Sequence, residues 1–325
     1  MWGSPAARLA RLADGYLVTQ LLHAAIALGV PEALATGPHT AAELAGRLGA
    51  DEQALQRVLR GLAAEEVLDE LPDGRFGLTA TGQLLRAGVP GSLRGSVTAR
   101  AQLYYAAAAG LPEAVRSGGT AFEVVHGQPF FDHLAAAPDR LAAFQASMAD
   151  RSAREAGAVV TAYDLSGLRS IVDVGGGTGT LLRAVRERVP GADVVLFDRP
   201  EVVAGSDLPS VGGDFSVAVP AGADAYLLSR VLHDWDDDDA VRVLRTCREA
   251  MRQDSRLLVV EAVLPERAAD DPAAVRMDLH VLLLLHGRER TVAEYGDLFA
   301  AAGLRLAAAV PTTAGVHVLE ARPVT

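Results

Sequence analysis

A run of glycines between an apolar segment and a helical segment constrains this chain more than any other feature. Residues 171–179 read IVDVGGGTG, which predicts a buried strand, a turn almost free of side chains, and a helix from Thr178. Glycines let a backbone approach a ligand closely, and a helix N-terminus offers unpaired N–H groups. The segment therefore predicts a ligand-binding turn, although a tight strand–helix connection with no ligand would use the same residues.

The segments after residue 170 alternate between short apolar runs and helical patterns. The apolar runs cover residues 170–174, 194–197, 225–228 and 257–261, and helices are expected from Thr178 and Asp236. This alternation predicts a parallel sheet with helices on both faces, and thus an α/β fold. A helix over 292–302 and strands over 304–310 and 315–321 are expected to complete it.

The N-terminal third has a different pattern, in which helices precede a hairpin. Residues 8–65 read as successive short helices, with Thr40 and Glu43 spaced as a capping box and Asp51 as a cap. Residues 67–78 then read as strand, turn and strand around Pro72-Asp73-Gly74. Three helices and a hairpin predict a winged helix. Residues 92–162 are Ala-rich and again helical.

Composition excludes several classes of protein. The net charge of −11 disfavours binding to nucleic acid or to an anionic membrane surface. Cys247 is the one cysteine, so neither an internal disulfide nor a thiolate metal cluster can form. The start lacks a secretory pattern and no apolar run approaches the roughly 20 residues of a membrane span. We expect a cytoplasmic protein.

Two acidic residues follow the glycine turn at spacings typical of a nucleotide site. Asp198 ends the next apolar run, where an acid can hold ribose hydroxyls. The glycine pattern differs from a dinucleotide motif and favours an adenosyl ligand that carries a carboxylate. Asp214 and Phe215 could bind an adenine edge and face, or could form a surface turn.

A basic residue and a histidine follow a later strand. Residues 227–239 read LLSRVLHDWDDDD, which places His233 at the carboxyl edge of the predicted sheet, where ligands bind in such folds. A lone histidine is more often structural, but the surrounding motif favours a catalytic role here. The run from Asp236 to Asp239 is interpreted mainly as the solvated start of a helix.

The motifs DVGGGTG, FDRP, GDF, LLSRVLHDW, VVEAVLPE and HGRERT occur in the order seen in plant and bacterial caffeate/hydroxyindole-type O-methyltransferases. The chain resembles this family over essentially its whole length, and especially the members that tailor aromatic natural products. The resemblance implies a class I methyltransferase Rossmann-like sheet with a mainly helical winged-helix dimerisation domain. The expected domains are residues 1–90 for dimerisation, 91–165 as a helical linker contributing to the acceptor pocket, and 166–325 for catalysis.

The resemblance also implies a role for individual residues. His233 matches the family's general base, and Glu261 and Glu289 match the two carboxylates that orient it. The residues expected to bind S-adenosylmethionine are Gly175, Gly176, Gly177, Asp198, Asp214, Phe215, Ser229 and Arg230. Among these, Arg230 is expected to steady the cofactor carboxylate. Ser216 stands where a second aromatic residue is common in the family, and the segment 199–213 is short.

The acceptor is expected to be a small aromatic molecule. By analogy with the family, Phe144, Met148, Met277, Asp278 and His280 are expected to line its pocket, although each is equally compatible with an ordinary core position. No metal site is expected. The resemblance implies methyl transfer to an aromatic hydroxyl in a homodimeric enzyme.

Three alternatives remain open at this stage. The same fold could support non-methylating chemistry on a natural product, such as hydroxylation, decarboxylation or a pericyclic reaction. A winged-helix DNA-binding regulator is disfavoured by the few bases in 51–66, and a nicotinamide dehydrogenase by the glycine pattern.

Overall fold

The helices of the N-terminal region form because each carries local signals at its ends. In the computed structural model, which describes residues 4–324, Thr40 and Glu43 form the expected capping box of helix α4 (Ala41–Leu48). Asp51 accepts a hydrogen bond from the backbone of Ala54 at the start of α5 (Glu52–Ala64). Both predicted caps are confirmed, and each contributes about 1 kcal/mol to helix stability.

The described chain divides into two compact units. The first consists of the described residues up to Ala109 together with Phe131–Arg151, and the second of Gly110–Phe130 and the described residues from Ser152 onward. The long helix α12 (Pro138–Ala162) contributes to both units.

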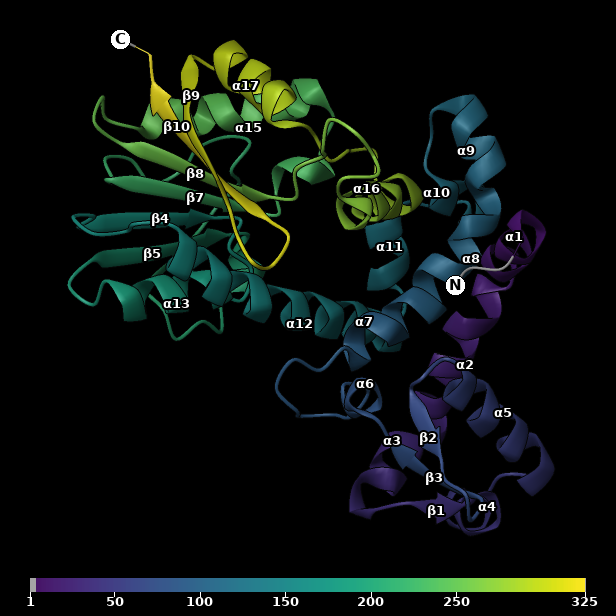
Figure 1. Ribbon diagram of the computed structural model, residues 1–325. Helices are drawn as coiled ribbons and strands as arrows, with labels where there is room; N and C mark the ends of the chain where they lie inside the picture. Colours follow the sequence, from purple (N-terminus) through teal and green to yellow (C-terminus); the bar gives the residue numbers. More distant parts are fainter. Residues whose placement is uncertain (1–3, 325) are drawn as a thin grey trace. The chain divides into compact units, whose positions relative to one another are not determined.

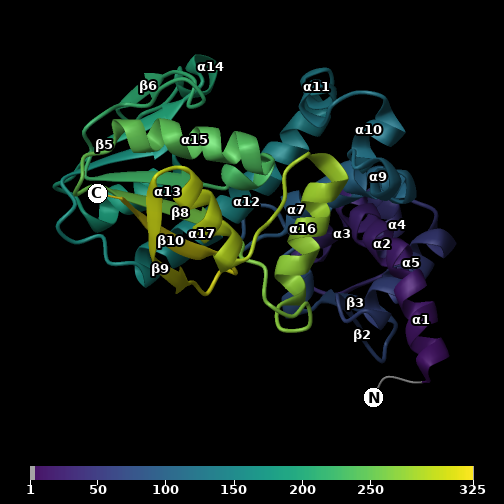
Figure 2. The same cartoon turned by 90° about the horizontal axis from the view of Figure 1, so that it is seen from above.

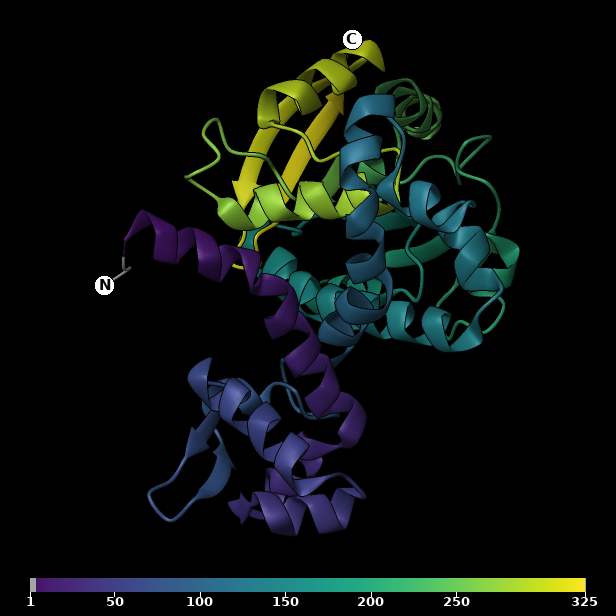
Figure 3. The same ribbon diagram turned by 90° about the vertical axis from the view of Figure 1, so that its right-hand side faces the viewer.

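The first unit is a helical domain with a small antiparallel sheet (Figures 1 and 3). Its further elements are α1 (Pro5–Ala13), α2 (Gly15–Leu28), α3 (Val30–Ala33), η1 (Leu34–Thr36), β1 (His39–Thr40), β2 (Leu68–Glu70), β3 (Arg75–Leu78), α6 (Ala80–Gln83), α7 (Arg94–Ala99), η2 (Arg100–Tyr104), α8 (Tyr105–Ala107) and α11 (Phe130–Ala135), which begins at the unit boundary. The predicted hairpin forms as β2 and β3, and the sheet order is β1-β3-β2. The two-residue strand β1 was not predicted, because it is too short to show a periodic pattern.

The second unit is built on a seven-stranded sheet in the order β6-β5-β4-β7-β8-β10-β9. Figure 2 shows β6 and β5 at one end of this order and β10 and β9 at the other. Its strands are β4 (Ser170–Val174), β5 (Asp193–Asp198), β6 (Ser210–Gly212), β7 (Ala225–Ser229), β8 (Arg256–Glu261), β9 (Leu304–Pro311) and β10 (His317–Pro323). The five strands from β6 to β8 are parallel, as the alternation predicted. The C-terminal strands add an antiparallel pair, so the sheet is mixed.

Helices cover both faces of this sheet, as Figure 1 shows. Apolar side chains of α15 (Asp237–Ala250) and α17 (Val292–Ala301) pack on one face, and those of α13 (Thr180–Arg188) and the end of α12 on the other. The unit also contains η3 (Ala108–Gly110) at its boundary, α9 (Leu111–Ser117), α10 (Ala121–His126), α14 (Pro200–Val203), η4 (Leu232–Asp234) and α16 (Pro272–Leu284). The predicted class I methyltransferase Rossmann-like fold is confirmed.

Among the described residues, no single helix is both long and apolar enough to cross a membrane. The bent pair Gly15–Leu28 and Val30–Thr36 reaches that length and composition only when both segments are counted across their 59° bend.

Candidate active site

The glycine turn lies at the carboxyl end of β4 and is tied to the neighbouring strand β5. The backbone N–H of Gly175 donates to the carbonyl oxygen of Phe197 at 2.8 Å. The N–H of Gly177 donates to Oδ2 of Asp198 at 2.8 Å. Asp198 therefore holds the turn at the position where the sequence predicted a ribose-binding acid, and its ribose role stays a prediction.

Two of the glycines lie where a side chain could not fit. A Cβ atom on Gly175 would lie 2.9 Å from Cγ2 of Val231, and one on Gly176 would lie 2.5 Å from Oδ2 of Asp173. Gly177 and Gly179 have positive φ angles of 57° and 76°. Because this backbone is not helical, α13 begins at Thr180, two residues later than predicted.

Asp173 is buried directly beneath this turn, with only 1% of its surface exposed. Neither of its carboxylate oxygens has a hydrogen-bond partner among the described residues. Burial, aided by the negative charge of Asp198, raises the pKa of Asp173 to about 7. No role was predicted for Asp173, but an acid within an otherwise apolar strand is a signal that could have identified it.

An aromatic pair lies beside the glycine turn. The ring of Phe215 lies 3.5 Å from the position of a Cβ on Gly175 and packs edge-on against Trp235, with ring centroids 6.3 Å apart. Asp214 accepts hydrogen bonds from the backbone and hydroxyl of Ser216, and these bonds lower its pKa. Phe215 thus adjoins the glycine turn as expected, and Ser216 has a partner in the exposed Asp214.

A histidine and two carboxylates meet after strands β7 and β8. Nδ1 of His233 lies 2.9 Å from Oε2 of Glu261 and 3.4 Å from Oε1 of Glu289. The closer contact is an ion pair when the imidazole is protonated, and neither atom makes an aligned hydrogen bond within the described part of the chain. Nε2 of His233 lies 3.1 Å from Oδ1 of Asp234. The structure therefore brings the three predicted catalytic residues together.

Burial alone lowers the pKa of His233, but Glu261 and Asp234 outweigh this effect, and the net pKa lies well above its ordinary value. His233 itself is only 7% exposed, and Glu261 and Glu289 are fully buried. An imidazole in this position can take up a proton and share its charge with the carboxylates beside Nδ1.

Hydrogen bonds fix the carboxylate of Glu261 and the main chain of Glu289. Oε1 of Glu261 accepts hydrogen bonds from the backbone N–H groups of Val231 and Leu232, at 3.0 and 2.9 Å. The backbone N–H of Glu289 donates to Asp278 on α16 at 2.9 Å. Asp278 was expected to line the acceptor pocket, and the structure places it in support of Glu289.

Arg230 follows the last residue of β7, Ser229, and lies among these acids. Its guanidinium pairs with Glu155 at 2.7 Å and with Glu289 at 3.1 Å. It was expected to steady the cofactor carboxylate, and that role stays a prediction. Glu155 was not predicted, because one glutamate in an Ala-rich helix carries no distinctive pattern.

A second buried arginine holds the loop that carries His233. The guanidinium of Arg290 is fully buried and donates to the carbonyl oxygens of Leu232 and Trp235. It also pairs with Asp237 at 2.8 Å. Asp236 caps α15 and Asp237 lies exposed in its first turn, as expected, whereas the pairing of Asp237 with Arg290 was not predicted.

The remaining predicted pocket residues belong to different units. Phe144 and Met148 lie on α12 in the first unit, where Phe144 packs edge-on against Phe131 with centroids 6.2 Å apart. Met277 and His280 lie on α16 in the second unit. Their role in acceptor binding stays a prediction.

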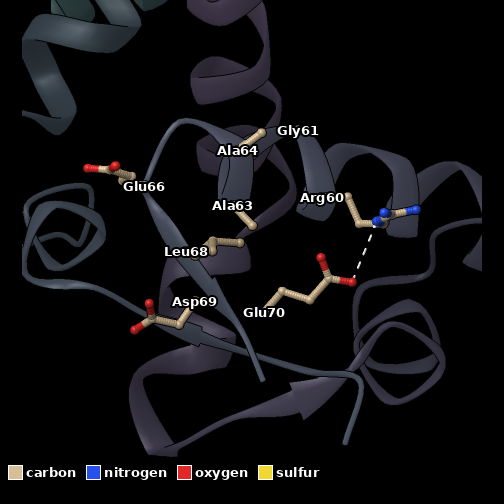
Figure 4. A pocket seen from close by; sticks show the side chains of 8 residues that line it. All are labelled: Arg60, Gly61, Ala63, Ala64, Glu66, Leu68, Asp69 and Glu70. Atoms are coloured by element: carbon tan, nitrogen blue, oxygen red, sulfur yellow. Dashed lines mark ion pairs between the residues drawn. The ribbon is translucent and has the colours of Figure 1, made fainter. Parts of the chain in front are cut away.

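A hollow of about 580 Å³ occurs elsewhere, at the end of α5 and along β2 (Figure 4). Its charged residues include Arg60 and Glu70, which pair at 3.5 Å. This hollow contains no histidine and lies in the first unit, so it is not the candidate active site.

The donor set around the glycine turn fits a cationic adenosyl cofactor. The turn allows close approach, Asp173 beneath it is an acid with no hydrogen-bond partner in the described part of the chain, and Phe215 offers a ring beside it. The ligand atoms of His233, Glu261 and Glu289 lie within 4.8 Å of one another and could hold a cation. Arg230, however, already supplies positive charge there. Fold and site together define a class I methyltransferase.

Comparisons with known proteins identify the family. Residues 109–305 match the O-methyltransferase domain, and residues 10–88 match the O-methyltransferase dimerisation domain. The chain is 40% identical to the phenazine O-methyltransferase PhzM of Lysobacter antibioticus, over 97% of this chain and 96% of the relative. It is 39% identical to the mitomycin biosynthesis 6-O-methyltransferase of Streptomyces lavendulae, over 95% and 92% of the two chains.

Solved structures agree with this similarity. One is the O-methyltransferase NcsB1 from neocarzinostatin biosynthesis, in complex with S-adenosylmethionine and 2-hydroxy-5-methyl naphthoic acid. It is 32% identical to this chain, the TM-score is 0.80, and the match covers 94% of this chain and 96% of the other. The chain belongs to the O-methyltransferase family and is an S-adenosylmethionine-dependent enzyme.

Proposed function

We propose that this enzyme methylates a hydroxyl group of a small aromatic metabolite, with His233 as the general base. The observation that carries the proposal is the buried contact of His233 Nδ1 with Glu261 and Glu289, on the opposite ring nitrogen from Nε2, which we propose meets the acceptor. Relatives named for phenazine and mitomycin O-methylation support an aromatic natural product as the acceptor.

The proposed chemistry needs a base because a phenol has a pKa of about 10 and is mostly protonated at neutral pH. S-adenosylmethionine, when bound, supplies a methyl group on a positively charged sulfur. Nε2 of His233 would take the hydroxyl proton as the oxygen–methyl bond forms and the methyl–sulfur bond breaks, which would leave S-adenosylhomocysteine. Glu261 and Glu289 then stabilise the imidazolium at Nδ1. Such base catalysis typically accelerates a reaction about 10²–10⁴-fold.

The position of Asp234 defines where the acceptor must bind. Its carboxylate lies 3.1 Å from Nε2 of His233 and its side chain is 32% exposed. We expect the acceptor hydroxyl to take this place, since Asp234 can turn toward solvent. Main-chain contacts hold His233 itself, because Arg290 and Glu261 fix the backbone on either side of Leu232.

The test is an assay of the purified protein with a panel of hydroxylated aromatic acceptors, phenazines and naphthoates among them. We expect a product heavier by one methyl group and an equal amount of S-adenosylhomocysteine. A modified acceptor formed while S-adenosylmethionine is left unconsumed would contradict the proposal and would indicate non-methylating chemistry.

We also propose that the first unit forms a homodimer. Its match to a dimerisation domain supports this, and so does helix α1, which has no buried residue and exposes Leu9 and Leu12. The double substitution of both leucines by aspartate should shift the protein to monomer in sedimentation velocity. An unchanged sedimentation coefficient would show that α1 is outside the interface.

A further inference from the structure

The guanidinium of Arg230 lies close to three carboxylates. Its Nη2 lies 2.7 Å from Oε1 of Glu155, and its Nε lies 3.2 Å from Oε2 of the same carboxylate. Its Nη1 faces the other way, 3.1 Å from Oε1 of Glu289 and 3.9 Å from Oε2 of Glu261. One guanidinium therefore bridges a helix residue and both acids beside His233.

The bridge is buried and geometrically defined. The side chains of Arg230 and Glu155 are 15% and 8% exposed, respectively. Glu155 binds two guanidinium nitrogens at once, which fixes the plane of the guanidinium. Glu155 lies on α12, whereas Arg230 lies just after β7, so the pair joins two separate elements of the second unit.

The backbone of Arg230 is also unusual. Its φ angle is +57°, a left-handed conformation that side-chain-bearing residues rarely adopt. Its N–H donates to the carbonyl oxygen of Val260, and the next two N–H groups point at Glu261. Because this conformation costs free energy, the surrounding contacts must maintain it.

Acids outnumber cations around His233, and Arg230 offsets part of their negative charge. Glu155, Glu261 and Glu289 supply three carboxylates, and Arg230 is the guanidinium among them. Oε1 of Glu289 lies 3.1 Å from Arg230 and 3.4 Å from Nδ1 of His233, so the guanidinium and a protonated imidazole compete for the same oxygen.

We propose that Glu155 and Arg230 form a positioning pair in which Glu155 holds the guanidinium against Glu289 and Glu261, so that Arg230 shares their negative charge with His233. This inference rests on the proposed role of His233 as the base. Arg230 and Glu155 act through the carboxylates, and the expectation that Arg230 binds the cofactor carboxylate is the competing assignment.

The pair sets how strongly His233 holds its proton. Glu261 and Asp234 raise the pKa of His233, and a base that is too strongly paired stays protonated and inactive. Removing the positive charge of Arg230 should raise this pKa further. Removing the negative charge of Glu155 should lower it, because the charge of Arg230 then falls more fully on Glu289 and Glu261.

The substitutions of Arg230 and Glu155 leave the other charged and titratable side chains near His233 in the sequence. Asp234 faces Nε2 from the same loop, and Arg290 donates to the carbonyl oxygen of Leu232. Tyr295 of α17 is buried near Glu261 and Glu289, and its hydroxyl has no hydrogen-bond partner among the described residues. Among the described residues, none of these groups forms a hydrogen bond or ion pair with Glu155, so its substitution leaves their contacts unchanged.

The experiment is an NMR titration of ring-labelled histidine in the cofactor-free protein. The chain has 8 histidines, and the signal of His233 is assigned by its absence in His233→Gln. We expect Arg230→Met to raise the midpoint for His233 by about one pH unit and Glu155→Gln to lower it, the scale of one nearby charge. Arg242→Met, which removes an exposed arginine on α15, is the matched control and should leave it unchanged.

The possible outcomes separate the two assignments of Arg230. Midpoints that stay at the parent value in both variants, or move in the same direction, would overturn the proposal. If Arg230→Met does not fold, Glu155→Gln alone decides by the sign of its shift. Calorimetry with S-adenosylhomocysteine adds a second measurement: affinity retained in Glu155→Gln and Arg230→Lys supports the positioning pair, whereas affinity lost in both with no shift in midpoint supports the cofactor assignment.

Failure of the proposed function would give a different result. His233→Gln that methylates at the parent rate would remove His233 as the base, yet the titration midpoints would still report whether the pair acts on the imidazole. If His233 is the base and the positioning pair acts on it, the acid limb of the pH dependence of kcat/KM should move in the same direction as the NMR midpoint in Arg230→Met and in Glu155→Gln.

Discussion

Asp173 and Glu261 are both buried acids on the same sheet, but their surroundings differ. Asp173 has no hydrogen-bond partner among the described residues, and burial raises its pKa to about 7. Glu261 accepts hydrogen bonds from two backbone N–H groups through Oε1. Its Oε2 lies 2.9 Å from Nδ1 of His233 and 3.9 Å from Nη1 of Arg230. The acids that were predicted to be catalytic thus lie beside His233 and Arg230, whereas Asp173 has no such neighbour among the described residues, and we propose that it meets the positive charge of the cofactor.

The two kinds of acid fit two different proposed roles at the same sheet, which are to orient His233 and to bind a cationic ligand. If Glu261 and Glu289 orient His233 as proposed, they must stay in place through every catalytic cycle, and the fold supplies their partners. An acid that recognises a cationic ligand is more useful without a partner in the protein, because the ligand then gains the whole interaction.

The largest expected effect follows from removing an acid that has partners. Glu261→Ala would leave the buried N–H groups of Val231 and Leu232 without an acceptor and His233 without its nearest carboxylate. We expect a loss of about 3–5 kcal/mol in the free energy of unfolding, measured by urea denaturation. Glu261→Gln is the matched control, since it keeps an acceptor oxygen and should recover most of the stability but not the activity. Equal free energies of unfolding for Glu261→Ala and the parent would show that the contacts of Glu261 do not stabilise the fold.

Asp173→Asn should have the opposite effect on stability. The folded protein must hold a proton on Asp173 up to about pH 7, whereas the unfolded chain releases it near pH 4, so the parent loses stability as the pH rises through this range. We expect the variant to be more stable than the parent by at least about 1 kcal/mol above pH 7, and equally stable below pH 4. Thermal unfolding across this pH range is the measurement.

The same variant should bind the cofactor less tightly. Calorimetry in buffers of different ionisation enthalpy should show proton release when S-adenosylmethionine binds the parent near pH 6.5, and none with Asp173→Asn. Cofactor affinity and proton release identical in the two proteins would show that Asp173 is not the acid that meets the ligand charge.

Removal of metal ions should have the smallest effect. Because Arg230 supplies positive charge beside Glu261 and Glu289, we expect no change in methylation rate after dialysis against a chelator. A rate that falls with the chelator and returns with added divalent metal would indicate that the three predicted catalytic residues hold an ion.

Local patterns allowed much of the fold to be predicted from the sequence. Capping residues such as Thr40 and Asp51 act over three or four positions, and apolar runs such as 225–228 identify buried strands directly. The turn after Val174 was also predictable, but the start of α13 was not, because it depends on the φ angles of Gly177 and Gly179.

The candidate site was predictable only where its residues lie in distinctive motifs. His233, Glu261 and Glu289 were predicted together through the family resemblance. Glu155 was missed because its partner lies 75 residues away, and such pairing leaves no trace in one sequence. Arg290 was missed because a charged residue in a loop is usually exposed, whereas this one is fully buried.

The central claim is that His233 removes the proton from the acceptor hydroxyl, and His233→Gln tests it most directly. With saturating S-adenosylmethionine and an accepted phenol, we predict a kcat lowered about 10²-fold or more, while the dissociation constant for S-adenosylhomocysteine stays within about threefold of the parent value. A kcat equal to that of the parent enzyme would contradict the account.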